Sequence, residues 1–191
     1  MKDSATMQEH RELQQIVPSK VCLSCDVCCR FLEQDSPLAP IFTEAEANTV
    51  IARGADANRF RPMADRKSAQ ITLKPHGDMY VCPFFEPETS ECTIYPYRPL
   101  DCQIYPFTLT YNAERTQVIL GVDMICPFGE AQLQTEPFQR YIAQLADYLE
   151  SEAIVETIAK NWSLIGEYQE TVVPIRVLER LNQALAKNNM S

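Results

Sequence analysis

Val21-Cys22-Leu23-Ser24-Cys25-Asp26-Val27-Cys28-Cys29-Arg30 is the stretch around which we expect the fold to be built, because it carries four cysteines in the pattern C-x-x-C-x-x-C-C. Thiolates two residues apart on a tight turn can converge on one point, as a soft metal ion or an iron–sulfur cluster requires. Four more cysteines follow later in the chain: Cys82, Cys92, Cys102 and Cys126. We expect the rest of the fold to bring these four back to the first four.

The composition is that of a globular protein. The chain has 191 residues, of which 46% are hydrophobic and 23% are charged. The formal net charge is -9, and an acidic surface disfavours binding to nucleic acid or to an anionic membrane. No apolar run approaches the roughly eighteen residues of a membrane span, and the first fifteen residues lack the apolar core of a secretory signal. We therefore expect a cytoplasmic protein that binds a metal ion, with a basic protein partner left open.

In a reducing cytosol, eight cysteines favour metal ligands or redox thiols over disulfides. The alternative is a set of four disulfides in a secreted domain. A disulfide between the adjacent Cys28 and Cys29 would be strained, so each of them would need a separate distant partner. The predicted metal ligands are Cys22, Cys25, Cys28, Cys29, Cys82, Cys92, Cys102 and Cys126.

The cysteine spacing leaves the identity of the metal open. The run C-x-x-C-x-x-C can supply three ligands to a [4Fe–4S] cluster, with the fourth from elsewhere in the chain. The first C-x-x-C is equally one half of a zinc knuckle. The predicted cofactor is therefore zinc or iron, with a [4Fe–4S] cluster as one form of the iron. Because adjacent side chains diverge, we expect Cys28 and Cys29 to face two sites, or one site and a reserve role.

Arg98 is the one predicted cofactor-binding residue that is not a cysteine. It lies between Cys92 and Cys102, in the segment Tyr97-Arg98-Pro99. A guanidinium can donate hydrogen bonds to cluster sulfurs, and it can offset the formal charge of about -2 on a four-thiolate zinc site. The alternative for Arg98 is a salt bridge that stabilises the fold.

Turn and periodicity signals before Gly129 predict short elements. Thr43 and Glu46 form a capping box that opens a helix ending near Arg53. The other expected elements are a hairpin of strands 71–73 and 79–81, a strand at 92–95, a helical turn at 100–105 and a second hairpin of strands 107–111 and 116–122.

After Gly129 the chain contains no cysteine and has helical periodicity. We expect helices at 136–150, 151–162 and 174–187, and we expect Trp162 and Tyr168 to be core or packing residues rather than ligand contacts. The predicted fold class is α+β: a small, metal-centred, cysteine-rich domain with short β-hairpins (residues 1–129), and a C-terminal helical extension packed on it (residues 130–191).

The order of these residues resembles the YkgJ-like cysteine-cluster family, which has a C-x-x-C-x-x-C-C signature. The similar positions are the first four cysteines, Cys82, Cys92, Ile94-Tyr95, Arg98-Pro99, Cys102, Tyr105-Pro106 and Cys126. The resemblance spans about residues 21–128 and implies chelation of zinc or iron. A related cysteine cluster occurs in flagellin lysine N-methylases, which are larger proteins. This chain has only 5 glycines and no evident Gly-rich S-adenosylmethionine loop.

Three functions follow from the sequence. The first is a metal-binding protein that chelates zinc or iron through its cysteine thiolates. The second is an Fe–S oxidoreductase or electron-transfer protein, and the third is a cluster-dependent modifying enzyme related to the lysine N-methylases. No Ser/His/Asp arrangement and no P-loop pattern supports a hydrolase or an NTPase, and whether the chain is an enzyme stays open.

Overall fold

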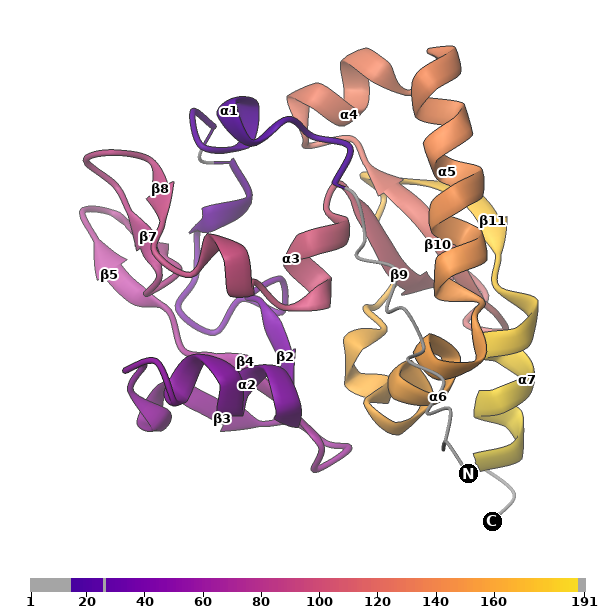
Figure 1. Ribbon diagram of the computed structural model, residues 1–191, viewed down its shortest axis with the longest axis horizontal. Helices are drawn as coiled ribbons and strands as arrows, with labels where there is room; N and C mark the ends of the chain where they lie inside the picture. The colour runs from indigo at the N-terminus through magenta and orange to yellow at the C-terminus, as the bar shows by residue number, and fades with distance from the viewer. Residues whose placement is uncertain (1–14, 26, 189–191) are drawn as a thin grey trace, which may run out of the picture.

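The computed structural model describes residues 15–25 and 27–188 of the chain (Figure 1). Within these ranges, α-helices alternate with short strands in four small antiparallel sheets, which confirms the α+β class. The helices are Ser19–Cys22 (α1), Glu44–Ile51 (α2), Leu100–Ile104 (α3), Pro127–Gln132 (α4), Glu136–Leu149 (α5), Glu152–Lys160 (α6) and Glu179–Asn188 (α7). None of the described helices is long and apolar enough to cross a membrane.

The described strands are short: Arg30–Phe31 (β1), Ile41–Thr43 (β2), Phe60–Pro62 (β3), Ser68–Ile71 (β4), Lys74–His76 (β5), Met79–Val81 (β6), Phe85–Glu86 (β7), Glu91–Cys92 (β8), Phe107–Tyr111 (β9), Val118–Asp123 (β10) and Val172–Val177 (β11). The first sheet has the order β1-β6-β5, the second β2-β4-β3, the third β7-β8 and the fourth β11-β10-β9. The first two sheets place strands side by side that are not consecutive in sequence.

The larger of two apolar clusters lies around the sheet β11-β10-β9. Every residue of the central strand β10 is buried, and α5 lies against this sheet (Figure 1). Helix α5 buries Phe138, Leu145 and Leu149 on one face, as its sequence period predicts. Apolar residues on both sides of Gly129 share this cluster, including Leu120 and Leu145. The division of the chain at residue 129 stays a prediction.

The smaller apolar cluster lies under α2 and the sheet β2-β4-β3, with Phe42, Ile71, Val81 and Phe85 among its buried members. The predicted capping box at the start of α2 is confirmed, because Glu46 and Thr43 each accept the other's backbone N–H. The strands around this cluster have only two to four residues. Strands so short give little independent stability, so we expect this half to depend on further links.

Two predicted strands in the first half have different bounds in the structure. Residues Met79–Val81 do form a hairpin strand, but their hairpin partner is Lys74–His76 rather than 71–73. The strand expected at 92–95 stops at Cys92, and Tyr95–Tyr97 forms a 3₁₀ helix instead. Pro96 explains this second difference, because it has no N–H to donate to a ladder.

The helix predicted at 174–187 is wrong in its first part. Residues Val172–Val177 form β11, and α7 begins only at Glu179. Pro174 is tolerated there because β11 is an edge strand and its pairing with β10 shifts register between Leu120 and Gly121. Gly121 allows this close approach, because a Cβ there would collide with a methyl group of Val172.

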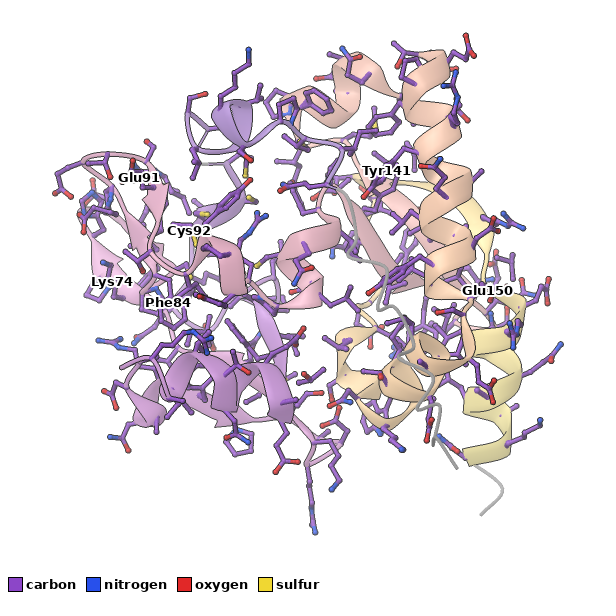
Figure 2. All side chains as sticks on the ribbon, viewed as in Figure 1. Lys74, Phe84, Glu91, Cys92, Tyr141 and Glu150 are labelled. Atoms are coloured by element: carbon purple, nitrogen blue, oxygen red, sulfur yellow. The ribbon has the colours of Figure 1, made fainter. Side chains whose placement is uncertain are left out.

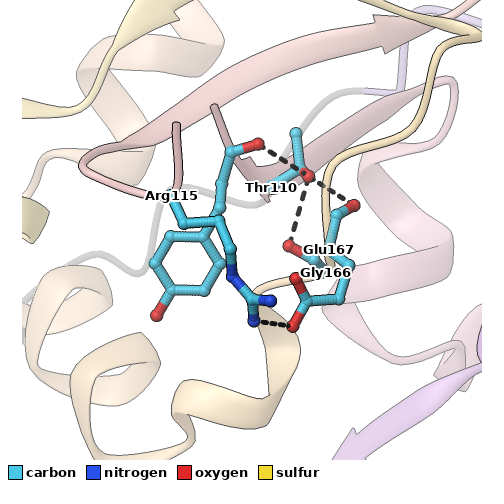
Figure 3. A network of polar contacts seen from close by, with 5 residues as sticks. Thr110, Arg115, Gly166 and Glu167 are labelled. Atoms are coloured by element: carbon cyan, nitrogen blue, oxygen red, sulfur yellow. Dashed lines mark hydrogen bonds and ion pairs between the residues drawn. The ribbon is translucent and has the colours of Figure 1, made fainter. Parts of the chain in front are cut away.

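Trp162 and Tyr168, predicted to be core or packing residues, do not lie in the core, since they are 45% and 43% exposed. The core position near them belongs to Leu164, in the 3₁₀ helix Trp162–Leu164. The following segment is fixed to β9 by polar contacts (Figure 3). The Thr110 hydroxyl lies 2.7 Å from the Glu167 carbonyl oxygen and 3.1 Å from that of Gly166, and Arg115 pairs with the Glu167 carboxylate.

Asp65 links the first half of the chain to the segment after α6. One carboxylate oxygen accepts the N–H groups of Lys67 and Ser68, at 2.9 and 2.7 Å. The other accepts the Ser68 hydroxyl at 2.8 Å and the N–H of Ser163 at 2.9 Å. Partial burial alone would raise the Asp65 pKa, but these hydrogen bonds together hold it below its usual value.

We expect Asp65→Ala to lower the free energy of unfolding by about 1–3 kcal/mol, because it leaves the N–H groups of Ser68 and Ser163 without their partner. The folded pKa is depressed, so this stabilisation is complete above the unfolded pKa of about 4 and is lost as the pH falls through the folded pKa. Urea unfolding at pH 7 and near pH 3 measures both effects. Asp56→Ala is the matched control, because the Asp56 carboxylate accepts hydrogen bonds from Asn58, two residues away. An equal loss in both variants would contradict the link.

Candidate metal centre

The four cysteines of the first motif lie on two short turns. Helix α1 ends at Cys22, and the Cys25 N–H donates to the Cys22 carbonyl at 3.2 Å. The 3₁₀ helix Val27–Cys29 then leads into β1. The four cysteines of the motif therefore lie on two consecutive short turns, and their convergence on one metal ion stays a prediction.

Cys82 and Cys92 reach the first motif through strand pairing. Strand β1 pairs with β6, and the N–H of Cys82 continues this ladder by donating to the Cys29 carbonyl at 3.1 Å. Strand β8 pairs with β7 so that Cys92 lies opposite Phe85. Phe85 follows Cys82 by three residues, so Cys92 is brought close to Cys82. The backbone alone therefore places both cysteines beside the motif.

Cys102 is positioned by α3, which two carboxylates attach to the first half of the chain. The Leu100 N–H donates to Glu46 at 2.7 Å, so the residue that completes the α2 capping box also binds the start of α3. The Ile41 N–H donates to Asp101 at 3.1 Å, and burial raises the Asp101 pKa to about 6. Cys126 comes from the other side as the N-cap of α4, where its sulfur lies 3.5 Å from the Gly129 nitrogen.

All eight cysteines are free thiols. Figure 2 shows several sulfurs near the labelled Cys92, between the α1 segment and α3. The thiol of Cys28 is close enough for charge interaction with those of Cys22, Cys82, Cys92, Cys102 and Cys126. The Cys25 thiol interacts in the same way with Cys22 and Cys126. Cys29 joins the group through a hydrogen bond with Cys28.

The protein surroundings favour the protonated form of these thiols. Burial is the largest cause that raises the pKa of Cys22, Cys92, Cys102 and Cys126, and it raises the pKa of Cys82 to about 12. For Cys28 the hydrogen bond with Cys29 contributes most, followed by desolvation among its neighbours. Cys28 is nevertheless the most exposed of the eight cysteines. A metal that binds here must displace thiol protons.

Arg98 lies against the thiols, where the sequence predicted it. Its Nη1 is 3.8 Å from the sulfur of Cys22, and its positive charge acts to lower the pKa of Cys22, Cys28 and Cys92. The guanidinium stacks on the Tyr95 ring at 3.8 Å from its centroid. Its Nε donates to the Tyr95 carbonyl at 3.1 Å. These contacts fix the charge in position beside the sulfurs.

Sequence reasoning missed several polar residues around the thiols. Gln15 accepts hydrogen bonds from Arg98 at 2.7 Å and from the Tyr95 hydroxyl at 2.9 Å, and nothing in the polar sequence around it signals this role. The Tyr105 hydroxyl lies 3.3 Å from an oxygen of the buried Asp123. Burial, then the charges of Asp123 and the nearby thiols, raise the pKa of Tyr105 far above its usual value.

The donor chemistry fits a soft metal, since thiols from several segments converge around Cys28 with a cation beside them. Among the described residues, no three His, Cys, Asp or Glu side chains already stand in an arrangement that could hold a metal ion. Binding would therefore require side-chain adjustment within the group of thiols.

Comparison with protein-family models assigns this arrangement to a family. The model of the CxxCxxCC family, described as "Putative zinc- or iron-chelating domain", matches residues 21–127, which is more than half of the chain. The chain belongs to the CxxCxxCC family. No curated protein and no solved structure matches the chain. The match confirms the resemblance inferred from the cysteine order, and membership in the CxxCxxCC family supports binding of zinc or iron as the general activity.

Proposed function

We propose that this CxxCxxCC protein binds zinc or iron through cysteine thiolates that converge on Cys28, and that the bound metal links the first half of the chain. The observation that supports the proposal most strongly is the position of Cys28, which interacts with thiols from β8, α3, the N-cap of α4 and the end of β6. A soft metal ion or cluster needs several thiolates around one point, and thiols from several segments near Cys28 can supply them after side-chain adjustment.

The residues around the thiols would prepare them for the metal. A bound cation supplies the positive charge that stabilises thiolate over thiol. Arg98 supplies part of that charge from a fixed position. Lys74 contributes from the other side, since its charge acts to lower the pKa of Cys82. The protons leave as the sulfurs bind.

An Fe–S cluster is the second candidate for the metal. The observation that favours it is the contact between Arg98 and the Cys22 sulfur, because N–H donors to sulfur tune the reduction potential of such clusters. The spacing of Cys22, Cys25 and Cys28 also suits three cluster ligands. On this alternative the protein would transfer electrons or support cluster-based catalysis.

Metal binding should release protons, which tests the proposed function directly. Because the thiol pKa values are raised, most ligand thiols are protonated at pH 7, and four thiolate ligands would release about four protons per metal ion. Calorimetric titration of the metal-free protein with Zn²⁺, in buffers of different ionisation enthalpy, counts these protons. The measured affinity should also rise as the pH rises from 6 to 8. Binding without proton release would contradict thiolate ligation.

We expect Arg98→Met to weaken metal binding by about 10- to 100-fold, because the thiolate-rich site loses a fixed cation and a hydrogen-bond donor. Arg53→Met is the matched control. Arg53 also stacks on a tyrosine, at 3.9 Å from the Tyr97 ring centroid, and its Nη1 donates to the Thr49 carbonyl at 2.9 Å. Competition with a chromophoric chelator measures both affinities. Equal losses in the two variants would show that Arg98 acts through aromatic packing alone.

A further inference from the structure

Arg98 lies beside the thiols and makes its polar contacts with neutral groups. Its Nη1 is 3.8 Å from the Cys22 sulfur, its Nη2 donates to the Gln15 amide oxygen at 2.7 Å, and its Nε donates to the Tyr95 carbonyl oxygen at 3.1 Å. The sequence left a salt bridge open as the alternative role of Arg98, and no carboxylate within the described ranges pairs with it. The positive charge of Arg98 is therefore directed at the sulfur and is not cancelled by a carboxylate.

The Gln15 side chain holds this arrangement from the segment before the cysteine motif. Its amide oxygen accepts the Tyr95 hydroxyl at 2.9 Å as well as the guanidinium, so one acceptor fixes both members of the Arg98–Tyr95 stack. The amide also forms a hydrogen bond with the Cys22 thiol, for which its nitrogen is the donor. Gln15 therefore contacts the cation, the ring that the cation stacks on, and a sulfur.

The backbone on each side of this contact is fixed by other parts of the fold. Next to Gln15, Ile16 packs against the larger apolar cluster and Val17 is buried. On the other side, the Gln103 amide nitrogen donates to the Arg98 carbonyl oxygen at 2.6 Å. These anchors involve no thiol, so the fold itself brings Gln15 and Arg98 together.

The chemistry of an amide matters at position 15. A carboxylate there could accept the same two hydrogen bonds, but it would pair with the guanidinium and cancel much of its charge, and it could not donate to the Cys22 sulfur. An apolar side chain would leave the guanidinium and the Tyr95 hydroxyl without their acceptor. An amide fixes the cation and leaves its charge available.

We propose that Gln15 is a positioning residue for metal binding, because this neutral acceptor fixes Arg98 beside Cys22 and leaves the guanidinium charge to the thiolates. This inference rests on the proposed function and deepens it by naming the residue that controls the charge at the site. It requires the hydrogen bonds of Gln15 and the absence of charge on its side chain to have separate, measurable effects.

Gln15→Glu separates the charge at this position from the hydrogen bonds. A carboxylate can still accept from Arg98 and Tyr95, so we expect the metal-free protein to unfold at a urea concentration equal to or higher than that of wild type. The same carboxylate cancels positive charge beside Cys22, so the affinity for Zn²⁺, measured by competition with a chromophoric chelator, should fall about 10- to 100-fold. A merely structural role would move stability and affinity in the same direction.

Gln144→Glu is the matched control for added charge. Gln144 is exposed on α5 and lines the same surface groove as Gln15, so this variant places a carboxylate nearby but not on Arg98. It should change the Zn²⁺ affinity by less than about threefold, because charges exposed to water interact weakly.

Gln15→Met provides a second comparison, because it removes the hydrogen bonds and adds no charge. Its metal-free form should unfold at a lower urea concentration than wild type, and its Zn²⁺ affinity should fall less than that of Gln15→Glu. Wild-type affinity in Gln15→Glu, an equal loss in Gln144→Glu, or a larger loss in Gln15→Met than in Gln15→Glu would each overturn this inference alone. Wild-type protein that takes up neither Zn²⁺ nor iron would overturn the proposed function, and this inference with it.

Discussion

Removal of the metal with a chelator will loosen the first half of the protein while the larger apolar cluster stays folded. The strands around the smaller cluster have two to four residues each, and their thiols come from segments that are distant in sequence. Metal binding contributes directly to folding when such short elements cannot bury enough apolar surface by themselves. In contrast, α5 has 14 residues and six buried side chains against a fully buried strand.

Hydrogen exchange with and without the chelator measures this difference. We expect exchange at Phe31, Tyr80 and Val81 to accelerate at least about a hundredfold, which corresponds to about 2.7 kcal/mol of local stability. Exchange at Leu145 and Leu149 in α5 should change by less than about threefold. Unchanged exchange in β1 and β6 would contradict a structural role for the metal, and equal acceleration in α5 would contradict its restriction to the first half.

Cys102→Ser should cause the largest loss of stability among the single substitutions considered. Serine has nearly the same volume as cysteine, so the variant leaves no large cavity. It does remove a soft ligand from the centre, and structural zinc sites can supply about 10–16 kcal/mol of apparent binding free energy. We expect most of the bound metal to be lost and the free energy of unfolding to fall by about 3 kcal/mol or more.

The control for Cys102→Ser is the same comparison in the presence of the chelator. If the loss acts through the metal, the difference in unfolding free energy between wild type and variant should shrink to within about 1 kcal/mol when both are metal-free. If Cys25 also binds the metal, Cys25→Ser should likewise lower both the metal content and the free energy of unfolding. Retained metal and wild-type stability in both variants would contradict a shared thiolate centre.

The local features around the thiols could be predicted from sequence. The spacing of Cys22, Cys25 and Cys28 favours two short turns, and the structure has those turns. That these thiols share a metal ion stays a prediction. The position of Arg98 between two cysteines likewise predicted a cation beside the thiols, and the structure places it 3.8 Å from the Cys22 sulfur. The capping box of α2 depends on two residues three apart, and it was predicted for the same reason.

The features that could not be predicted depend on contacts between distant segments. Gln15 reaches Arg98 across 83 positions, and Ser163 reaches Asp65 across 98. The mistaken helix at Pro174 has a similar cause. Apolar residues in this segment fit a helical period, but pairing with β10 overrides that local preference, and proline is acceptable because the strand lies at an edge.

The roles of Cys28 and Cys29 are a third feature that spacing alone leaves undecided. The sequence predicted that these adjacent thiols face two sites, or one site and a reserve role. In the structure the two thiols are hydrogen-bonded to each other, and Cys29 also packs against the smaller apolar cluster. The contacts of each thiol depend on the segments that fold around the motif, which local spacing does not encode.

The most direct test of the central claim is elemental analysis combined with a UV–visible spectrum on protein purified without oxygen. We expect zinc or iron at one or more equivalents per chain. Zinc without a visible band would indicate a thiolate ion site, and iron with acid-labile sulfide and a broad band near about 400 nm would indicate a [4Fe–4S]-type centre. Protein that contains no metal, and that takes up neither Zn²⁺ nor iron when these are supplied under reducing conditions, would contradict the proposal that this protein binds zinc or iron.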